Sequence, residues 1–335
     1  MAQAYIILFH KDIPQLLRLI QSIYKKKNTY VIHVCKNVLA PINAALIKQF
    51  DCYNNILFCE REYGNWGEFG IVQATLNAMV LLENNKIIYS HISLLSAQDF
   101  PIKKINHFEY LLQKNKDFSY LKWWDFYEQK ETKEILHTHS SWGATINTQK
   151  LRITRYYIKY NKNKERLVLP PRSNKGYLEF NTLNKIKHFV KSIFIKKYKF
   201  ENNFLQFIYS FKRDFPRKIP FVKVYGGSQW FTLNYKHVAY ILAYVKNNET
   251  TISFFKESML PDESFFQTIL LNSPYQKELV NDNLRLIEMQ ANHPLIYKKD
   301  DFEYLLNQQQ FFARKFDLNE DPEIFNLIEK NILDV

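Results

Sequence analysis

Residues 4–36 read AYIILFHKDIPQLLRLIQSIYKKKNTYVIHVCK and contain two short apolar runs with a different pattern between them. The runs at 5–9 and 30–34 consist mainly of β-branched and aromatic residues, which is typical of buried strands. Between them, residues 14–24 place an apolar side chain every three or four positions, and this spacing indicates an amphipathic helix. A strand, a helix and a strand in this order predict a βαβ unit with parallel strands.

The same alternation continues over the first hundred residues. We expect a helix at 41–50, a strand at 56–59, a helix at 70–83 and a strand at 86–95. The sequence therefore predicts an α/β fold in which helices flank a mostly parallel sheet.

Ligands of such sheets bind beyond the carboxyl ends of the strands. In this chain the predicted strand ends are followed by residues 9–11, 34–36 and 96–101, which directs attention to these three turns. Neither Gly-x-Gly-x-x-Gly nor a Walker motif occurs, so the sequence favours neither a dinucleotide site nor a P-loop.

The composition is that of a folded globular protein. The chain has 335 residues, of which 46% are hydrophobic, 16% aromatic and 24% charged, and these values exclude a disordered, collagen-like or disulfide-rich protein. Regular alternation is lost between residues 122 and 223, where Pro170-Pro171 also interrupts the chain. We interpret this region as an elaborated insertion rather than as a separate domain.

No segment has the pattern of a membrane span or a leader. The apolar run at 87–95 is far shorter than the roughly 20 residues that a helix needs to cross a bilayer. Residues 1–10 lack a basic leader, a long apolar region and a small-residue cleavage site. We therefore interpret them as the first strand and expect a cytosolic chain.

Cysteine and histidine show no metal-binding spacing. Cys35, Cys52 and Cys59 are odd in number and form no Cys-x-x-Cys pair, so we expect reduced and mostly buried thiols. His137 and His139 would share one face of a strand, but the sequence places no third ligand near them. The sequence therefore predicts no metal site.

Positive charge is concentrated in one segment. Residues 150–200 contain fifteen Lys or Arg and two acidic residues, a difference that equals the formal net charge of +13 for the whole chain. Such a patch suits the phosphates of a lipid-linked substrate, a membrane surface or a nucleic acid. Within it, residues 185–199 have an apolar stripe at helical spacing, as either a membrane-surface helix or an ordinary surface helix would.

Glycine is rare and clustered. Five of the seven glycines lie in GNWGEFG (64–70) and YGGSQWF (225–231), each of which also contains a tryptophan. Glycine permits sharp turns and a close approach of the backbone to a ligand. Both segments are therefore interpreted either as plain turns or as ligand-binding loops.

Two charged motifs could carry chemistry. MLPDESFFQTIL (259–270) places Pro261, Asp262 and Glu263 ahead of an apolar-periodic run, which predicts a helix N-terminus. Acids there stabilise the helix through its dipole, and a carboxylate that the helix terminus keeps ionised could also act as a general base toward a substrate hydroxyl.

The second motif, FFARKFD (311–317), predicts the end of another helix. Arg314 and Lys315 would there either interact with the helix dipole or clamp a diphosphate, which suits a planar guanidinium beside a point charge. The chain contains no Asp-x-Asp motif.

Seven short motifs, taken in chain order, carry a family resemblance. They are AYIILFHK (4–11), YVIHVCK (30–36), WG (66–67) followed by VQA (72–74), LLSAQDFPI (94–102), GGSQWF (226–231), PDE (261–263) and FFARKF (311–316). Over most of its length the sequence resembles glycosyltransferase family 14, which includes the core-2/I-branching β-1,6-N-acetylglucosaminyltransferases and the peptide O-xylosyltransferases. Its FFARKF ending is most similar to xylosyltransferases and bacterial relatives.

The resemblance implies a GT-A fold and an inverting, metal-independent transferase that uses a UDP-sugar and needs no cofactor. Glu263 matches the family's catalytic base, which would deprotonate the acceptor hydroxyl as it attacks the anomeric carbon. Arg314 and Lys315 match the cations that stabilise the leaving diphosphate in place of a metal ion.

The resemblance also implies the remaining site residues. On the donor side these are His10, Cys35, Lys36, Trp66, Asp99 and Arg285, and on the acceptor side Gly227, Ser228, Gln229 and Trp230. Cys35 stands where the family usually has an Asp that contacts the nucleoside. Gln229 stands where xylosyltransferases carry an Asp near the donor sugar, so xylose loses support as the donor.

We therefore expect one GT-A domain over 1–335, with a nucleotide-binding βαβ part at 1–120, a basic insertion at 121–223 and an acceptor and catalytic part at 224–335. It would move a sugar, with N-acetylglucosamine favoured, from a UDP-sugar to a saccharide acceptor, including a lipid-linked one, in capsule or lipo-oligosaccharide synthesis. We expect a cytoplasmic protein with peripheral contact to the anionic inner membrane face, and no nucleic acid partner. A catalytically inactive saccharide-binding relative and a nucleic-acid-binding protein that uses residues 150–200 are the alternatives.

Overall fold

The computed structural model describes residues 1–126, 152–159, 166–169, 217–290 and 293–333. Most of the predicted insertion, including His137, His139 and the predicted helix at 185–199, lies outside the described residues. Its described parts are residues 152–159, 166–169 and 217–223 together with the end of a strand that begins at Ser119.

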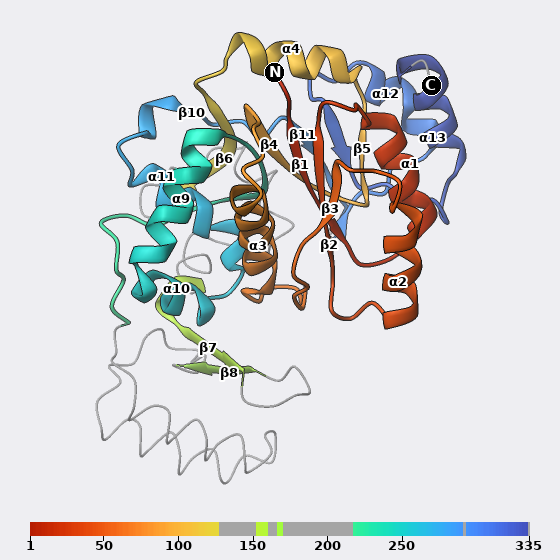
Figure 1. The fold of residues 1–335 in the computed structure, drawn as a ribbon. Helices are drawn as coiled ribbons and strands as arrows, with labels where there is room; N and C mark the ends of the chain where they lie inside the picture. Colours follow the sequence, from red (N-terminus) through yellow and green to blue (C-terminus); the bar gives the residue numbers. More distant parts are fainter. Residues whose placement is uncertain (127–151, 160–165, 170–216, 291–292, 334–335) are drawn as a thin grey trace.

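A seven-stranded sheet forms the centre of the fold (Figure 1). Its strands are β1 (Ala4–Phe9), β2 (Thr29–Val34), β3 (Ile56–Phe58), β4 (His91–Ser96), β6 (Ser119–Asp125), β9 (Tyr225–Asn234) and β10 (Leu279–Val280). They lie in the order β10-β6-β9-β4-β1-β2-β3. Among these described strands β9 alone is antiparallel to its neighbours, and the other adjacent pairs are parallel. The predicted α/β fold with a mostly parallel sheet flanked by helices is confirmed.

Alternate residues of β1 pack into two different hydrophobic clusters, as the period of two in a strand requires. Tyr5, Ile7 and Phe9 belong to one cluster, and Ala4 and Ile6 to the other. The first cluster includes residues of α1 (Ile13–Ile23), α2 (Ala40–Gln49), α4 (Ile105–Lys114), α12 (Phe302–Leu306) and α13 (Glu323–Ile328). The second includes residues of α3 (Gly70–Asn84), α9 (Tyr235–Asn247), α10 (Glu249–Lys256) and α11 (Phe265–Leu271). Both faces of the sheet are therefore covered, and Figure 1 shows the two groups of helices on opposite sides.

The predicted helices and strands of the first hundred residues are present, with small shifts at their ends. The largest shift concerns the strand expected at 86–95, because β4 begins only at His91. Lys86 has a left-handed φ of 53° and follows the end of α3. The residues around Lys86 therefore form a turn rather than the start of the strand.

A second, three-stranded sheet has the order β11-β14-β5 and comprises β11 (Arg285–Ile287), β14 (Phe312–Arg314) and β5 (Asp99–Pro101). The prediction that residues 311–317 form the end of a helix is therefore wrong. The preceding helix, α12, ends at Leu306, and Phe312 then pairs with Pro101 and packs against the ring of Phe108. Tertiary pairing outweighs the local helical spacing here.

The described part of the insertion packs against α10. It contains the hairpin of β7 (Tyr156–Lys159) and β8 (Arg166–Leu169), which extends below α10 in Figure 1. The Tyr157 amide donates to the Glu257 carbonyl at 2.9 Å. The remaining short elements are η2 (Pro261–Glu263), η3 (Gln276–Glu278), β12 (Met289–Gln290), β13 (His293–Pro294), η4 (Lys299–Asp301) and η5 (Glu329–Leu333). Among the described residues no helix is both long enough and apolar enough to cross a membrane.

Candidate active site

One edge of the main sheet gathers most of the predicted site residues. β1, β2 and β4 are parallel, so the residues that follow them, His10, Cys35 and Gln98, lie at the same edge. β9 runs in the opposite direction, so its first residues, from Tyr225 to Ser228, reach that edge as well. The predicted donor and acceptor segments are therefore neighbours at this edge.

Arg314 is held at this edge by three contacts. The register of β14 with β5 sets it opposite Asp99, and its Nη1 donates to Asp99 Oδ1 at 2.9 Å. The same nitrogen donates to the Ser96 hydroxyl, and the guanidinium carbon lies 4.8 Å from the centre of the Trp230 ring. A salt bridge and a cation–π contact thus fix the orientation of the cation.

Further positive charge surrounds Arg314. Burial is the main cause that lowers the pKa of Lys315, and the charges of Arg314 and Lys11 lower it further. Lys11 pairs with Asp317 at 2.7 Å. Partial burial of its imidazole lowers the pKa of His10 to about 4, and these same cations add to that effect. His10 is therefore neutral at neutral pH, beside a cluster of cations that favours an anionic ligand.

Cys35, Lys36 and Trp66 lie in the neighbouring turns. The buried Cys35 sulfur accepts a hydrogen bond from the Gly64 amide at 3.2 Å, and Lys36 pairs with Glu62 at 3.4 Å. Trp66 is 69% exposed, which leaves most of its ring accessible to a ligand. The loop that carries it reaches the segment before Glu263, because the Gly67 carbonyl accepts from the Leu260 amide at 3.3 Å.

Glu263 lies in a single 3₁₀ turn, Pro261–Glu263, that precedes α11, which begins at Phe265. The expected helix N-terminus is thus displaced beyond the two acids. Glu263 is 7% exposed, and Arg152 Nη1 donates to its Oε2 at 3.0 Å.

The ionisation of Glu263 differs from the sequence-based prediction. Burial raises its pKa well above the usual range and the adjacent Asp262 adds to this, whereas Arg152 lowers it. The prediction that the helix terminus keeps the carboxylate ionised is therefore wrong. In this structure the opposing influence comes from Arg152.

Several polar atoms around Glu263 are buried without a hydrogen-bond partner among the described residues. They are Asp262 Oδ1, Ser264 Oγ and Gln267 Oε1. Burial also raises the pKa of Asp262 to about 6. Unsatisfied buried polar groups are costly in a folded protein and often mark functional sites.

The start of β9 packs tightly against this turn. The Ser228 carbonyl accepts from Gln267 Nε2 at 2.6 Å, and its hydroxyl accepts from Asn283 Nδ2 at 2.9 Å. A Cβ atom at Gly227 would lie 2.1 Å from the Lys122 carbonyl oxygen, so only glycine fits there. Gln229 is half-buried and Trp230 is buried.

Arg285 is buried beneath the site. Its Nη1 donates to the Asn283 carbonyl at 2.9 Å and its Nη2 to the Thr232 hydroxyl at 3.2 Å, and it lies over the Phe312 ring. Burial lowers its pKa to about 10, and the charge of Asp99 opposes that shift. It contacts protein groups on β9, β14 and the turn before β11.

Sequence reasoning missed Arg152, Asp262 and Ser96 as members of this arrangement. Arg152 is separated from Glu263 by 111 positions, and its one signal in the sequence is membership of the basic segment. The sequence predicts Asp262 as an acid at a helix N-terminus, but its burial beside Glu263 depends on the packing of α11. Ser96 precedes the predicted turn and contributes through its hydroxyl.

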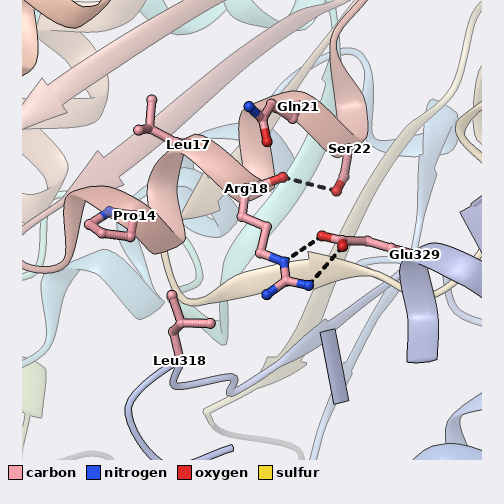
Figure 2. Close-up of a pocket in the computed structure, with 7 residues that line it drawn as sticks. All are labelled: Pro14, Leu17, Arg18, Gln21, Ser22, Leu318 and Glu329. Carbon is pink, nitrogen blue, oxygen red and sulfur yellow. Dashed lines mark hydrogen bonds and ion pairs between the residues drawn. The ribbon is translucent and has the colours of Figure 1, made fainter. Parts of the chain in front are cut away.

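A cavity of about 500 Å³ lies elsewhere on the molecule and contains none of the predicted site residues. Figure 2 shows it between α1 and the C-terminal region, where Arg18 donates to both carboxylate oxygens of Glu329 at 2.6 and 2.7 Å. Within the described ranges, no three His, Cys, Asp or Glu side chains lie close enough together to bind a metal ion. Of the three cysteines, Cys35 and Cys59 are buried, Cys52 is exposed, and all are free.

Comparison with known proteins gives the family. The profile of the Core-2/I-Branching enzymes matches residues 3–163 and 174–308. Xylosyltransferase 1 of Canis lupus familiaris is 24% identical over 359 residues, which cover 97% of this chain and 30% of that protein. Xylosyltransferase 2 of the same species is 31% identical over 189 residues, which cover 48% of this chain and 22% of that protein. The Homo sapiens protein named Probable beta-1,3-galactosyl-O-glycosyl-glycoprotein beta-1,6-N-acetylglucosaminyltransferase 7 is 22% identical over 346 residues, or 98% of this chain and 67% of that protein.

The mostly parallel sheet, its flanking helices and the site at the strand ends define a GT-A-like glycosyltransferase fold. The chain belongs to the Core-2/I-branching enzyme family, a family of glycosyltransferases that corresponds to the resemblance found in the sequence. It spans less than a third of the length of each of the two canine xylosyltransferases.

Proposed function

We propose that this chain transfers a sugar from a UDP-sugar to a hydroxyl of a saccharide acceptor, with inversion and without a divalent metal ion. One observation carries the proposal. A neutral His10 lies among three cations, Arg314, Lys315 and Lys11, at one edge of the sheet. The start of β9 reaches the same edge, and η2, which carries Glu263, packs on β9.

The cations bind the diphosphate of the donor. As the bond between the anomeric carbon and the diphosphate breaks, negative charge grows on the leaving UDP. Arg314 and Lys315 stabilise that charge from fixed positions, and preorganised groups of this kind can contribute about 3 to 4 kcal/mol to lowering the barrier. Since the Asp99 salt bridge neutralises part of the charge of Arg314, Lys315 supplies much of the net attraction.

Glu263 acts as the general base. Its carboxylate takes the proton of the acceptor hydroxyl while that oxygen attacks the anomeric carbon from the face opposite UDP, so configuration inverts in one displacement. The buried surroundings that raise its pKa make the ionised carboxylate a stronger base toward that proton. The base must nevertheless be ionised before it reacts.

N-acetylglucosamine is the donor sugar that we propose. The names of relatives include both xylosyltransferases and a β-1,6-N-acetylglucosaminyltransferase. The family resemblance implies that xylosyltransferases carry an Asp near the donor sugar at the position of Gln229. Because Gln229 lacks that negative charge, it supports N-acetylglucosamine rather than xylose. We further propose a lipid-linked saccharide acceptor in surface-glycan synthesis, with the basic segment 150–200 contacting an anionic membrane.

A screen of UDP-sugars for slow hydrolysis tests this function. We expect one UDP-sugar, with UDP-N-acetylglucosamine first, to be hydrolysed in the presence of EDTA, and UDP to raise the melting temperature under the same conditions. Stabilisation by UDP that requires Mn²⁺ would contradict the metal-independent mechanism. Donor binding without turnover over a broad acceptor panel would favour an inactive saccharide-binding relative, and DNA binding tighter than UDP binding would favour the nucleic-acid alternative.

The variant Glu263→Gln tests the assigned base. General base catalysis typically contributes about 10²- to 10⁴-fold to a rate, so we expect turnover to fall by that factor. The shift in melting temperature on adding UDP should stay at the wild-type value, because Glu263 does not contact the diphosphate in this mechanism. Transfer at the wild-type rate would show that another group takes the proton.

A further inference from the structure

We propose that Arg152, which the insertion supplies, is a positioning residue for Glu263: its guanidinium fixes the orientation of the carboxylate and stabilises its ionised form. The inference rests on the proposed function of Glu263 as a base. It extends that function by giving the insertion a role in catalysis in addition to any contact with the acceptor or a membrane.

The contact between the two side chains is short and shielded from water. Arg152 Nη1 lies 3.0 Å from Glu263 Oε2, and the two side chains are 12% and 9% exposed. A charge-assisted hydrogen bond in such surroundings is stronger and more directional than one at an open surface. The second carboxylate oxygen, Oε1, makes no hydrogen bond that would compete for the same orientation among the described residues.

The backbone of Arg152 is fixed to the same segment. Its carbonyl accepts from the Met259 amide at 3.0 Å, close before the turn that carries Glu263. Arg217 ties the two segments together, because its Nη1 donates to the carbonyls of Arg155 at 2.9 Å and Glu257 at 3.1 Å. These hydrogen bonds fix the backbone from which the Arg152 guanidinium reaches Glu263.

The site needs such a cation because two carboxyl groups are adjacent and buried. Asp262 and Glu263 are 4% and 7% exposed. Burial and like charge both favour the protonated, inactive form of Glu263, and Arg152 opposes them. The balance of these three groups sets the pH at which the base becomes ionised.

Two substitutions should move that pH in opposite directions. Arg152→Met removes the favourable charge, so the acid limb of kcat/KM for UDP-sugar hydrolysis should move upward by about one to three pH units. Asp262→Asn removes the unfavourable charge, so the limb should move downward. Arg152→Lys keeps a positive charge and should restore much of the wild-type profile, and raising the pH should recover the activity of Arg152→Met.

Arg18→Met is the matched control. It also breaks an arginine–carboxylate pair, the one with Glu329 in Figure 2, but in the middle of α1, beside a cavity that contains none of the predicted site residues. Its pH profile should equal that of the wild type. A loss of activity in Arg152→Met that is equal at every pH, or an unmoved acid limb, would overturn the inference.

A titration without turnover separates this inference from the proposed function. In protein labelled with ¹³C-glutamate, the carboxyl signal of Glu263 is the one that is missing from the Glu263→Gln variant. Arg152→Met should raise the pH at the midpoint of that signal's titration. Turnover in the wild type with an unmoved midpoint would overturn the Arg152 inference alone. A moved midpoint in a wild type that hydrolyses no UDP-sugar would overturn the proposed function and support the Arg152–Glu263 coupling.

Discussion

Arg314 contacts a buried acid on one side and an aromatic ring on the other. Asp99 is 2% exposed and accepts hydrogen bonds from the Ser96 amide at 2.8 Å and from Arg314 at 2.9 Å. Trp230 covers the guanidinium at 4.8 Å. Arg314 thus neutralises Asp99 within the fold, and we propose that it also presents positive charge to a ligand, a role that can be separated from the first.

Removing this arginine alone should be costly. Arg314→Met leaves the buried Asp99 carboxylate without its cation, and breaking a buried pair in this way costs about 3 to 5 kcal/mol. Arg314→Met with Asp99→Asn removes both charges and should recover most of that stability. Urea unfolding of the two single variants and the double variant measures the coupling between the residues.

UDP affinity should behave differently from stability in this cycle. Both variants that lack Arg314 should bind UDP more weakly than the wild type, whether or not Asp99 is also changed. Wild-type UDP affinity in the stable double variant would remove Arg314 from the diphosphate site while leaving its structural role intact.

At this scale the sequence predicts residues near strand ends better than it predicts their partners. His10, Asp99 and Arg314 are all brought to one region, as the strand ends and the family resemblance led us to expect. Arg152 could not be found in this way, because its contact with Glu263 depends on how the insertion packs on α10. A lysine-rich and arginine-rich segment does not indicate which of its cations turns inward.

At the scale of elements, β9 connects the proposed donor and acceptor parts of the site. Its first residues pack on η2 and α11, and Trp230 further along the strand contacts Arg314. The close approach of β9 to β6 and α11 requires a residue without a side chain at position 227, where a Cβ would lie 2.1 Å from the Lys122 carbonyl oxygen.

Gly227→Ala should therefore displace β9 or α11. Overpacking of this kind costs about 1 to 3 kcal/mol of stability. The new Cβ would also displace the side-chain amide of Gln267, one turn after Glu263, so we expect turnover to fall. Gly64→Ala is the control, since its Cβ would meet Cys35 Sγ at an ordinary 3.4 Å. Thermal unfolding of both variants should show a loss at Gly227 and a change within about 0.5 kcal/mol at Gly64. Equal effects would mean that the contact at Lys122 relaxes easily.

Element prediction succeeded where one pattern dominated and failed where tertiary pairing decided. The strand and helix periods of the first hundred residues reproduce the βαβ order closely. Residues 311–317 have a spacing that also fits a helix, yet Phe312–Arg314 forms a strand because β5 and β11 flank it. Pro261 correctly marked the start of a helical segment, but the first turn is 3₁₀ and α11 begins only at Phe265.

At the scale of the whole molecule, buried histidines make stability depend on pH. His33 is buried and accepts a hydrogen bond from the Glu62 amide at 2.8 Å, so it is held neutral. Burial, with smaller contributions from Arg61 and Lys36, lowers its pKa from 6.5 to about 4. Between these values the unfolded chain binds more protons, so the contribution of His33 to stability is present above pH 6.5 and is lost as the pH falls toward 4.

His33→Gln should remove this dependence while keeping an acceptor for the Glu62 amide. Between pH 7 and pH 4.5 the wild type should lose about 1 to 3 kcal/mol relative to the variant. Asp262→Asn gives the opposite sign: the pKa of Asp262 is raised to about 6, so the wild type should gain stability relative to that variant over the same range. Urea unfolding at a series of pH values measures both, and parallel curves for the wild type and His33→Gln would contradict the assignment.

The pairing of Arg314 with Asp99, across 215 positions, also sets an order of events during synthesis of the chain. The ribosome releases β1, β2 and β4 long before residue 314, and contacts this distant in sequence close late in folding. A growing chain that already carries Glu263 still lacks Arg314 and Lys315, the residues that we propose bind the diphosphate. In the proposed mechanism, these two donor-binding cations are therefore synthesised after Glu263 and after the strands of the main sheet on which η2 packs.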